Sequence, residues 1–156
     1  MASTTPKTIL LQQNANGDFR PIYGYPAAVA TTPGSIVELT SAQKVTPVVT
    51  AGKAVPKMFA LENPFAALQN ALSIDQDYPV DEEVRVIYAQ PGDLIYARLA
   101  ASQTIAVGDY LVTSTTAGCL AEATVDATTL SGAIVGVAVE AVTTTGAVGR
   151  VKVRVL

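Results

Sequence analysis

The sequence predicts an all-β domain, a small closed barrel or sandwich made of short strands. Three observations predict it. Of 156 residues, 20 are Val and 18 are Thr, and β-branched side chains fit a pleated sheet better than a helix. Apolar and basic residues alternate strictly from Arg150 to Val155, the pattern of a strand with one solvated face. Turn-forming residues recur at the short intervals typical of barrels and sandwiches.

Residues 1–33 are predicted to form an extended amino-terminal arm. Glycines and prolines interrupt this stretch, and we expect them to prevent regular structure. Three of the nine aromatic residues nevertheless lie here, namely Phe19, Tyr23 and Tyr25. Because aromatic side chains bury large areas, the arm should pack on something. The sequence leaves two alternatives open: its own barrel or a neighbouring subunit.

Residues 34–156 are predicted to form a single barrel-like domain. Its first half is predicted to contain strands at Ile36–Thr40, Val45–Thr50 and Met58–Glu62. Residues 57–80 could be an insertion that carries the one short helix. Pro64 suits a first helical turn, and the residues from Ala66 to Leu72 have good helix propensity.

The second half is predicted to consist of hairpins. Strands at Val84–Tyr88 and Leu94–Leu99 flank a Pro-Gly turn, which indicates the first hairpin. A second hairpin joins Tyr110–Ser114 to Cys119–Ala123. The stretch Ala133–Val142 is apolar on both faces, as in a central strand, and we expect it to pair antiparallel with the last strand.

Composition argues against several function classes. Charged residues make up only 15% of the chain, so hydroxyl and methyl groups must cover much of a surface suited to contact with protein. A net charge of −3 argues against nucleic-acid binding. The chain has no histidine, the commonest general base, so we expect no enzyme and no cofactor. Its single cysteine, Cys119, is interpreted as a small buried hydrophobe. No apolar stretch approaches the roughly 20 residues that cross a membrane.

Two groups of charged residues have both a structural and a functional interpretation. Five of the 13 acidic residues lie within nine positions, at Asp75, Asp77, Asp81, Glu82 and Glu83. They indicate either a solvated loop or a cation site, although the spacing is not that of an EF-hand. The second group is the row Arg150, Lys152 and Arg154 on one face of the last strand. It would pair with the acidic group inside one subunit, the interpretation we favour, or contact another chain.

The order of segments in residues 80–156 resembles that of tailed-phage head decoration proteins, also called capsid cement or stabilising proteins. The succession is DEEVRV at 81–86, PGDLIY at 91–96, TIAVGDYLV at 104–112, AGCL at 117–120, GAIVGVAVE at 132–140 and VKVRVL at 151–156. The resemblance implies a compact β-barrel or β-tulip that binds the outside of an assembled icosahedral shell, commonly as a trimer. It implies no catalysis.

From the resemblance and the composition together we expect a structural virion protein on the capsid exterior, assembled in the host cytoplasm. Its expected partners are the major capsid protein and further copies of itself, most simply in a homotrimer, with no nucleic acid and no membrane. One alternative is a tail, head-fibre or carbohydrate-binding virion component. Another is a metal-dependent hydrolase that uses Asp75, Asp77, Asp81 and Glu83. The residues expected at the capsid or subunit interface are Phe19, Ile22, Tyr23, Tyr25, Phe65, Leu68, Leu72, Arg150, Lys152 and Arg154.

Overall fold

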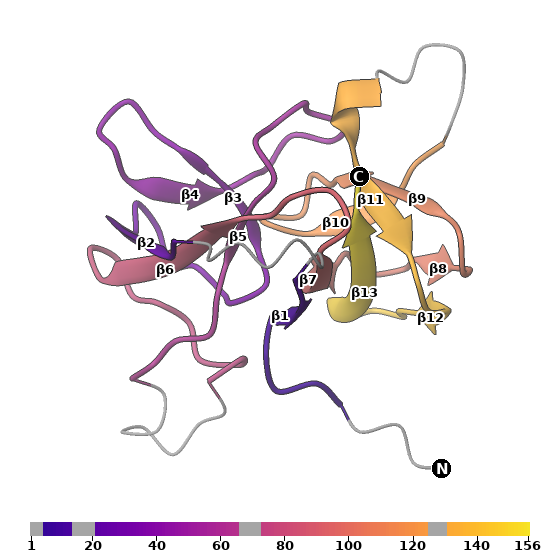
Figure 1. The fold of residues 1–156 in the computed structure, drawn as a ribbon, viewed down its shortest axis with the longest axis horizontal. Coiled ribbons are helices and arrows are strands. Elements are labelled where there is room, and N and C mark those ends of the chain that lie inside the picture. Colours follow the sequence, from indigo (N-terminus) through magenta and orange to yellow (C-terminus); the bar gives the residue numbers. More distant parts are fainter. Residues whose placement is uncertain (1–4, 14–20, 66–72, 125–130) are drawn as a thin grey trace.

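The fold is nearly all β, as predicted, and its centre is a closed five-stranded barrel (Figure 1). The computed structural model describes residues 5–13, 21–65, 73–124 and 131–156. The barrel strands follow in the order β7 (Leu94–Leu99), β10 (Leu120–Glu122), β9 (Tyr110–Thr113), β11 (Ile134–Ala138) and β13 (Gly149–Val155). Pairing of β13 with β7 over six residue pairs closes the ring.

A short strand from the predicted arm completes one side of the barrel. β1 (Leu10–Gln12) pairs antiparallel with the start of β7, at Leu94 and Ile95, whereas β10 meets the same strand only at Leu99. The amide of Tyr96 also donates to the Ile9 carbonyl, 2.7 Å away, and the Ile9 side chain is fully buried. This part of the arm therefore packs on its own chain.

A second, five-stranded sheet lies beside the barrel. Its order is β2 (Tyr23–Pro26), β6 (Glu83–Tyr88), β5 (Met58–Ala60), β3 (Ile36–Leu39) and β4 (Val45–Pro47). β5, near the start of the predicted insertion at residues 57–80, is thus a central strand of this sheet. A small ribbon of β8 (Thr104–Ile105) and β12 (Val142–Thr143) and a 3-10 turn at Ser131–Ala133 complete the described elements.

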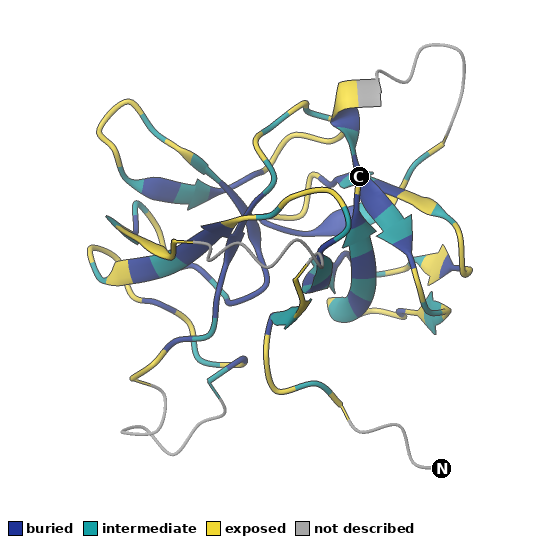
Figure 2. Ribbon diagram, in the orientation of Figure 1, coloured by how far each residue is buried: buried dark blue, intermediate teal, exposed yellow. Residues whose placement is uncertain are grey.

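The second sheet is buried on both faces. Phe59 and Ile87 point toward the barrel core, and Met58 and Val86 point to the opposite side, where Tyr78 covers them. Buried strands consequently meet where sheet and barrel join, and exposed residues concentrate in the outer loops (Figure 2). The barrel interior is filled by Ile95, Ala97, Leu99, Leu111, Leu120, Val135, Val151, Val153 and Val155.

Most strand predictions are confirmed. β11 and β13 pair antiparallel, with Val137 opposite Arg154, and β9 and β10 form the expected hairpin, with Leu120 opposite Thr113. The interpretation of Cys119 is also confirmed, because its side chain is fully buried. Burial also raises the pKa of the thiol.

Two predictions are wrong. The turn at Gln90–Asp93 forms, with the Asp93 amide donating to the Gln90 carbonyl, but the strands on its two sides do not make a hairpin. β6 pairs with β2 and β5, and β7 pairs with β13, β1 and β10, so both edges of each strand are already occupied. The expectation of irregular backbone throughout residues 1–33 also fails, since β1 and β2 form there. The helix predicted after Pro64 falls on residues 66–72, outside the described part of the chain.

Candidate interaction surface

Aromatic residues gather along the outer strand of the second sheet, where Tyr23 and Tyr88 are exposed and Tyr25 is partly buried. Tyr23 and Tyr25 are two positions apart on β2, so they point to the same face, and Tyr88 at the end of β6 joins them. The Tyr23 ring centroid lies 5.4 Å from that of Tyr88 in an edge-to-face contact and 6.3 Å from that of Tyr25. Ile22, one position before Tyr23 in the chain, is also exposed. We call Ile22, Tyr23, Tyr25 and Tyr88 the aromatic edge.

Local sequence explains why the aromatic edge lies at the rim of a sheet. Within the described residues β2 pairs only with β6, and its last residue, Pro26, has no amide hydrogen to donate. Gly24 lies between the two tyrosines because a Cβ at this position would meet the Glu83 carboxyl group on β6. Glu83 therefore crosses one face of β2, and the tyrosines occupy the other.

The aromatic edge surrounds a small hollow of about 170 Å³, lined by Pro21, Tyr23, Tyr88 and Gln90. Partial burial is the main cause that raises the pKa of the Tyr88 hydroxyl, and a side-chain hydrogen bond with Tyr25 raises it further. The Tyr88 phenol is therefore neutral at ordinary pH. Such a surface buries apolar area in a complex and still offers hydroxyl groups for hydrogen bonds, which is why tyrosine is enriched at protein interfaces.

The row of basic residues on β13 is held by contacts within the protein. Lys152 Nζ lies 2.9 Å from a Glu140 carboxylate oxygen, and Arg154 Nη1 donates to the Gly92 carbonyl at 2.9 Å. Arg150 Nη2 lies 3.8 Å from Asp75 Oδ1. Pairing with the acidic group inside one subunit, the interpretation we favoured, is therefore confirmed for Arg150, whereas Lys152 uses a different acid.

The acidic group from Asp75 to Glu83 is spread over a loop and a strand. Asp75 pairs with Arg150, Asp81 lies 2.5 Å from Lys44 Nζ, and Glu83 begins β6. Among the residues that the structure describes, no three Asp, Glu or Cys side chains come together in a way that could hold a metal ion. The hydrolase alternative requires Asp75, Asp77, Asp81 and Glu83 to converge on one metal ion, and among the described residues no such group forms.

The remaining predicted interface residues divide into two groups. Phe65 is exposed in the loop after Leu61, where its amide donates to Asn63 Oδ1. Phe19, Leu68 and Leu72 lie outside the described residues. Tyr23 and Tyr25 are brought together on one face of β2, and Ile22 is exposed directly before this strand. The structure tests no contact of any of them with a partner.

The prediction missed Tyr88, the third ring of the aromatic edge. Alternation with Val84 and Val86 places Tyr88 on the same face of β6 as these buried residues, and that signal was present in the sequence. Its proximity to Tyr23 depends on the pairing of β2 with β6, in which Tyr23 is opposite Val86. These two strands are nearly 60 positions apart, so local patterns carry no information on their register.

Comparison with known proteins identifies no family. No protein-family model matches the sequence, and no curated protein matches it. In the described parts of the chain, no helix has the length and apolar character needed to span a membrane.

Proposed function

We propose that this protein is a structural virion component that binds the outer surface of an assembled phage capsid. There it stabilises the shell by bridging neighbouring major capsid protein subunits, as a homotrimer that engages several of them together. The order of segments in residues 80–156 supports this proposal, and so do the barrel fold and the low surface charge.

The aromatic edge is the observation that carries the proposal. Isolated apolar residues on a surface are ordinary, but a contiguous aromatic group on an outer strand is a typical interaction site. Tyr23 and Tyr88 pack against each other and leave their outer faces for a partner. The neighbouring backbone of β2 provides unpaired edge groups within the described sheet, to which an extended segment of a capsid subunit could add.

Stabilisation follows from selective binding. A protein that binds the assembled shell, and not the separated subunits, shifts the equilibrium toward assembly. Each contact can be modest, because a trimer that binds several subunits raises the effective concentration of its second and third contacts. The mechanism requires no bond to be made or broken, and no titrating group at the aromatic edge.

The test is co-sedimentation with expanded, undecorated heads of the phage whose genome carries this sequence. We expect saturable binding, a higher melting temperature of the heads, and a trimer in analytical ultracentrifugation. Deletion of residues 1–33 would be a poor variant, since Ile9 and Ala27 are fully buried. Point substitutions at the aromatic edge avoid that problem.

Tyr23→Ser and Tyr110→Ser are a matched pair. The two tyrosines are 40% and 42% exposed, and they lie on strands β2 and β9 at opposite ends of the molecule (Figure 1). Tyr23→Ser should weaken head binding about ten-fold or more, as expected for an interface aromatic, and Tyr110→Ser should leave it unchanged. A monomer that ignores the heads would refute the proposal, and equal effects of the two substitutions would remove the aromatic edge from it.

The hollow beside Tyr23 favours one second candidate, a carbohydrate-binding virion component. Two tyrosine rings and the Gln90 side chain surround this hollow, and a sugar ring can stack on an aromatic face while an amide bonds its hydroxyl groups. A glycan array distinguishes the candidates: binding to glycans without binding to heads would replace the capsid proposal.

A further inference from the structure

A second pocket lies on the barrel side of the molecule, and it shares no lining residue with the hollow at the aromatic edge. It has a volume of about 140 Å³ and is built where four segments meet: the amino-terminal segment before β1, the loop after residue 72, β7 and β13. Its lining is mainly apolar, apart from the charged groups of three residues. The residues around it are Thr5, Pro6, Lys7, Ile74, Asp75, Tyr96 and Arg150.

Arg150 is the best-buried charged residue of this pocket. Its side chain is only 15% exposed, and its guanidinium carbon lies 5.8 Å from the centre of the Tyr96 ring. Nη1 donates to the Pro33 carbonyl at 2.9 Å, and Nη2 donates to the Ile74 carbonyl at 2.6 Å. A guanidinium group has further N–H donors besides these, so Arg150 is fixed in orientation and retains capacity to bind a ligand.

The backbone is shaped to accept Arg150 at this place. Gly34 adopts the left-handed conformation, with φ of 84°, and a Cβ there would collide with Nη1 of Arg150. The Gly34 carbonyl also accepts from the Arg98 amide at 3.1 Å. The loop around Gly34 thus fits closely against the arginine and fixes its position, as expected of a binding site and not of a mobile surface side chain.

Positive charge around the pocket exceeds negative charge. Arg150 lies directly opposite Arg98 in the pairing of β13 with β7, and like charges in this relation repel each other. Within the part of the chain that the structure describes, the Arg98 guanidinium donates to neutral oxygens, those of Ser35 and Ala117. Lys7 adds a third cation at the rim.

Asp75 is the acid closest to Arg150, and it compensates the charge poorly. Its carboxylate is 3.8 Å from Nη2 and 61% exposed, so water screens the attraction. Burial accordingly lowers the pKa of Arg150 despite this neighbour. A largely buried cation with a weak partner gains free energy from an anion that can enter the same desolvated space.

We propose that this pocket binds a carboxylate group carried on a short apolar stem. The carboxylate would take the remaining donors of Arg150, since the guanidinium fork matches its two oxygens. The stem would lie against Tyr96, Ile74 and Pro6. The same group can come from a small free acid or from the carboxyl terminus of a polypeptide. This binding site is independent of the proposed capsid function and of the aromatic edge.

Calorimetric titration of the full-length protein with butyrate, and with neutral butyramide as its control, tests the proposal. We expect butyrate to bind at one site and to shift the Tyr96 ring resonances in NMR spectra, with butyramide at least about ten-fold weaker. Equal binding of the two compounds, or binding of neither, would overturn the proposal. Acetyl-Ala-Ala with a free or an amidated carboxyl terminus then identifies the source of the carboxylate. If only the peptide with the free terminus binds, and binds tighter than butyrate, the natural ligand is a polypeptide terminus. If that peptide binds more weakly than butyrate, the natural ligand is a small acid.

Asp75→Asn provides a second test, in which the substitution should increase the affinity for butyrate. This exposed substitution leaves the fold intact and removes the acid that competes for Arg150, so butyrate should bind about two- to five-fold tighter. Asp77→Asn, in the same loop, should change nothing. Arg150→Gln should abolish binding, whereas Arg154→Gln, on the same strand but bonded to Gly92, should retain it. Weaker or unchanged binding in Asp75→Asn would contradict the proposed role of Arg150.

Discussion

Gly136 is the position where one methyl group should most directly disturb the barrel. It lies on β11, opposite Val155 of β13 and Leu111 of β9. A Cβ here would lie 2.6 Å from Val153 Cγ1 and closer still to the Arg154 carbonyl oxygen, both inside the 3.0 Å that real Cβ atoms respect. The carbonyl cannot rotate away, because Arg154 is also paired with Leu94 of β7. Gly136→Ala should therefore separate two strands of a closed ring.

The size of the effect follows from two opposing contributions. Overpacking a core typically costs about 1–3 kcal/mol, and a collision with paired backbone belongs at the upper end of that range. Alanine also lowers the conformational entropy of the unfolded chain relative to glycine, which offsets about 0.4–1 kcal/mol of this cost. The free energy of unfolding should thus fall by roughly 2–2.6 kcal/mol. At about 2–4 °C per kcal/mol for a chain of this size, the melting temperature should fall by roughly 4–10 °C.

Urea and thermal unfolding followed by circular dichroism measure this change, with Gly146→Ala as the control. Gly146 lies in the loop between β12 and β13, and a Cβ there meets nothing within 4 Å. Its substitution should leave stability within about 0.5 kcal/mol of the parent protein or raise it slightly. If both variants unfold at the same urea concentration, the close contact of β11 with β13 is not a constraint, and the reasoning fails.

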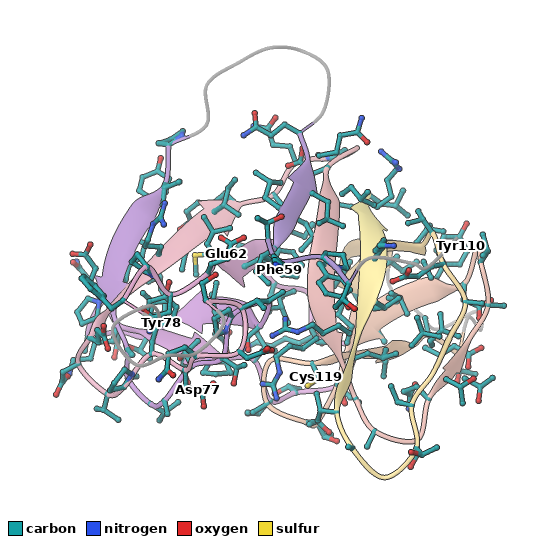
Figure 3. All side chains as sticks on the ribbon, turned by 90° about the horizontal axis from the view of Figure 1, so that it is seen from below. Phe59, Glu62, Asp77, Tyr78, Tyr110 and Cys119 are labelled. Atoms are coloured by element: carbon teal, nitrogen blue, oxygen red, sulfur yellow. The ribbon has the colours of Figure 1, made fainter. Side chains whose placement is uncertain are left out.

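Three other predictions concern buried side chains. Tyr78 is fully buried, and its hydroxyl donates to the Glu62 carbonyl at 2.7 Å. Burial raises the pKa of this hydroxyl above that of an unfolded tyrosine. The neutral phenol therefore stabilises the fold fully below about pH 10, and above that pH the free energy of unfolding falls by roughly 1.4 kcal/mol per pH unit. Tyr78→Phe should reduce the slope in urea titrations by this amount and cost about 1–2 kcal/mol at neutral pH. An unchanged slope in the variant would assign it to other groups. Cys119, buried with a raised thiol pKa, should react with Ellman's reagent only after unfolding, and fast reaction of the native protein would contradict its burial. Phe59→Ala, at the junction of sheet and barrel (Figure 3), should lower the free energy of unfolding by about 3–5 kcal/mol in the same assay, and a loss below about 1 kcal/mol would mean that the junction repacks.

The predicted strands agree well with the observed ones where local patterns determine them. Alternation along Arg150–Val155 and the turn residues after Thr113 depend on neighbours in the chain, and both elements form as expected. The misplaced hairpin at Gln90–Asp93 has the opposite cause. Its turn chemistry is correct, but competition for strand edges by β5 and β13 decides which strands pair.

The candidate sites show the same division. Tyr23 and Tyr25 were predicted as contact residues from their aromatic character, but the ring that completes their surface, Tyr88, comes from a strand whose register only the fold sets. The sequence predicts that Arg150 pairs with the acidic group or contacts another chain. Its position over Tyr96 and against the Ile74 carbonyl, largely out of water, depends on the tertiary structure.

By itself, the sequence determined that this chain forms β-strands, where most of them lie, and that a sparsely charged surface surrounds them. These properties depend on side-chain periodicity and turn residues within a few positions of one another. The tertiary structure alone decided that the strands divide into a closed barrel and a second sheet, that three tyrosines share one rim, and that one arginine is desolvated beside a pocket. Each of these depends on pairing between distant segments, because the whole fold decides which strand edges pair and which charged side chains become buried.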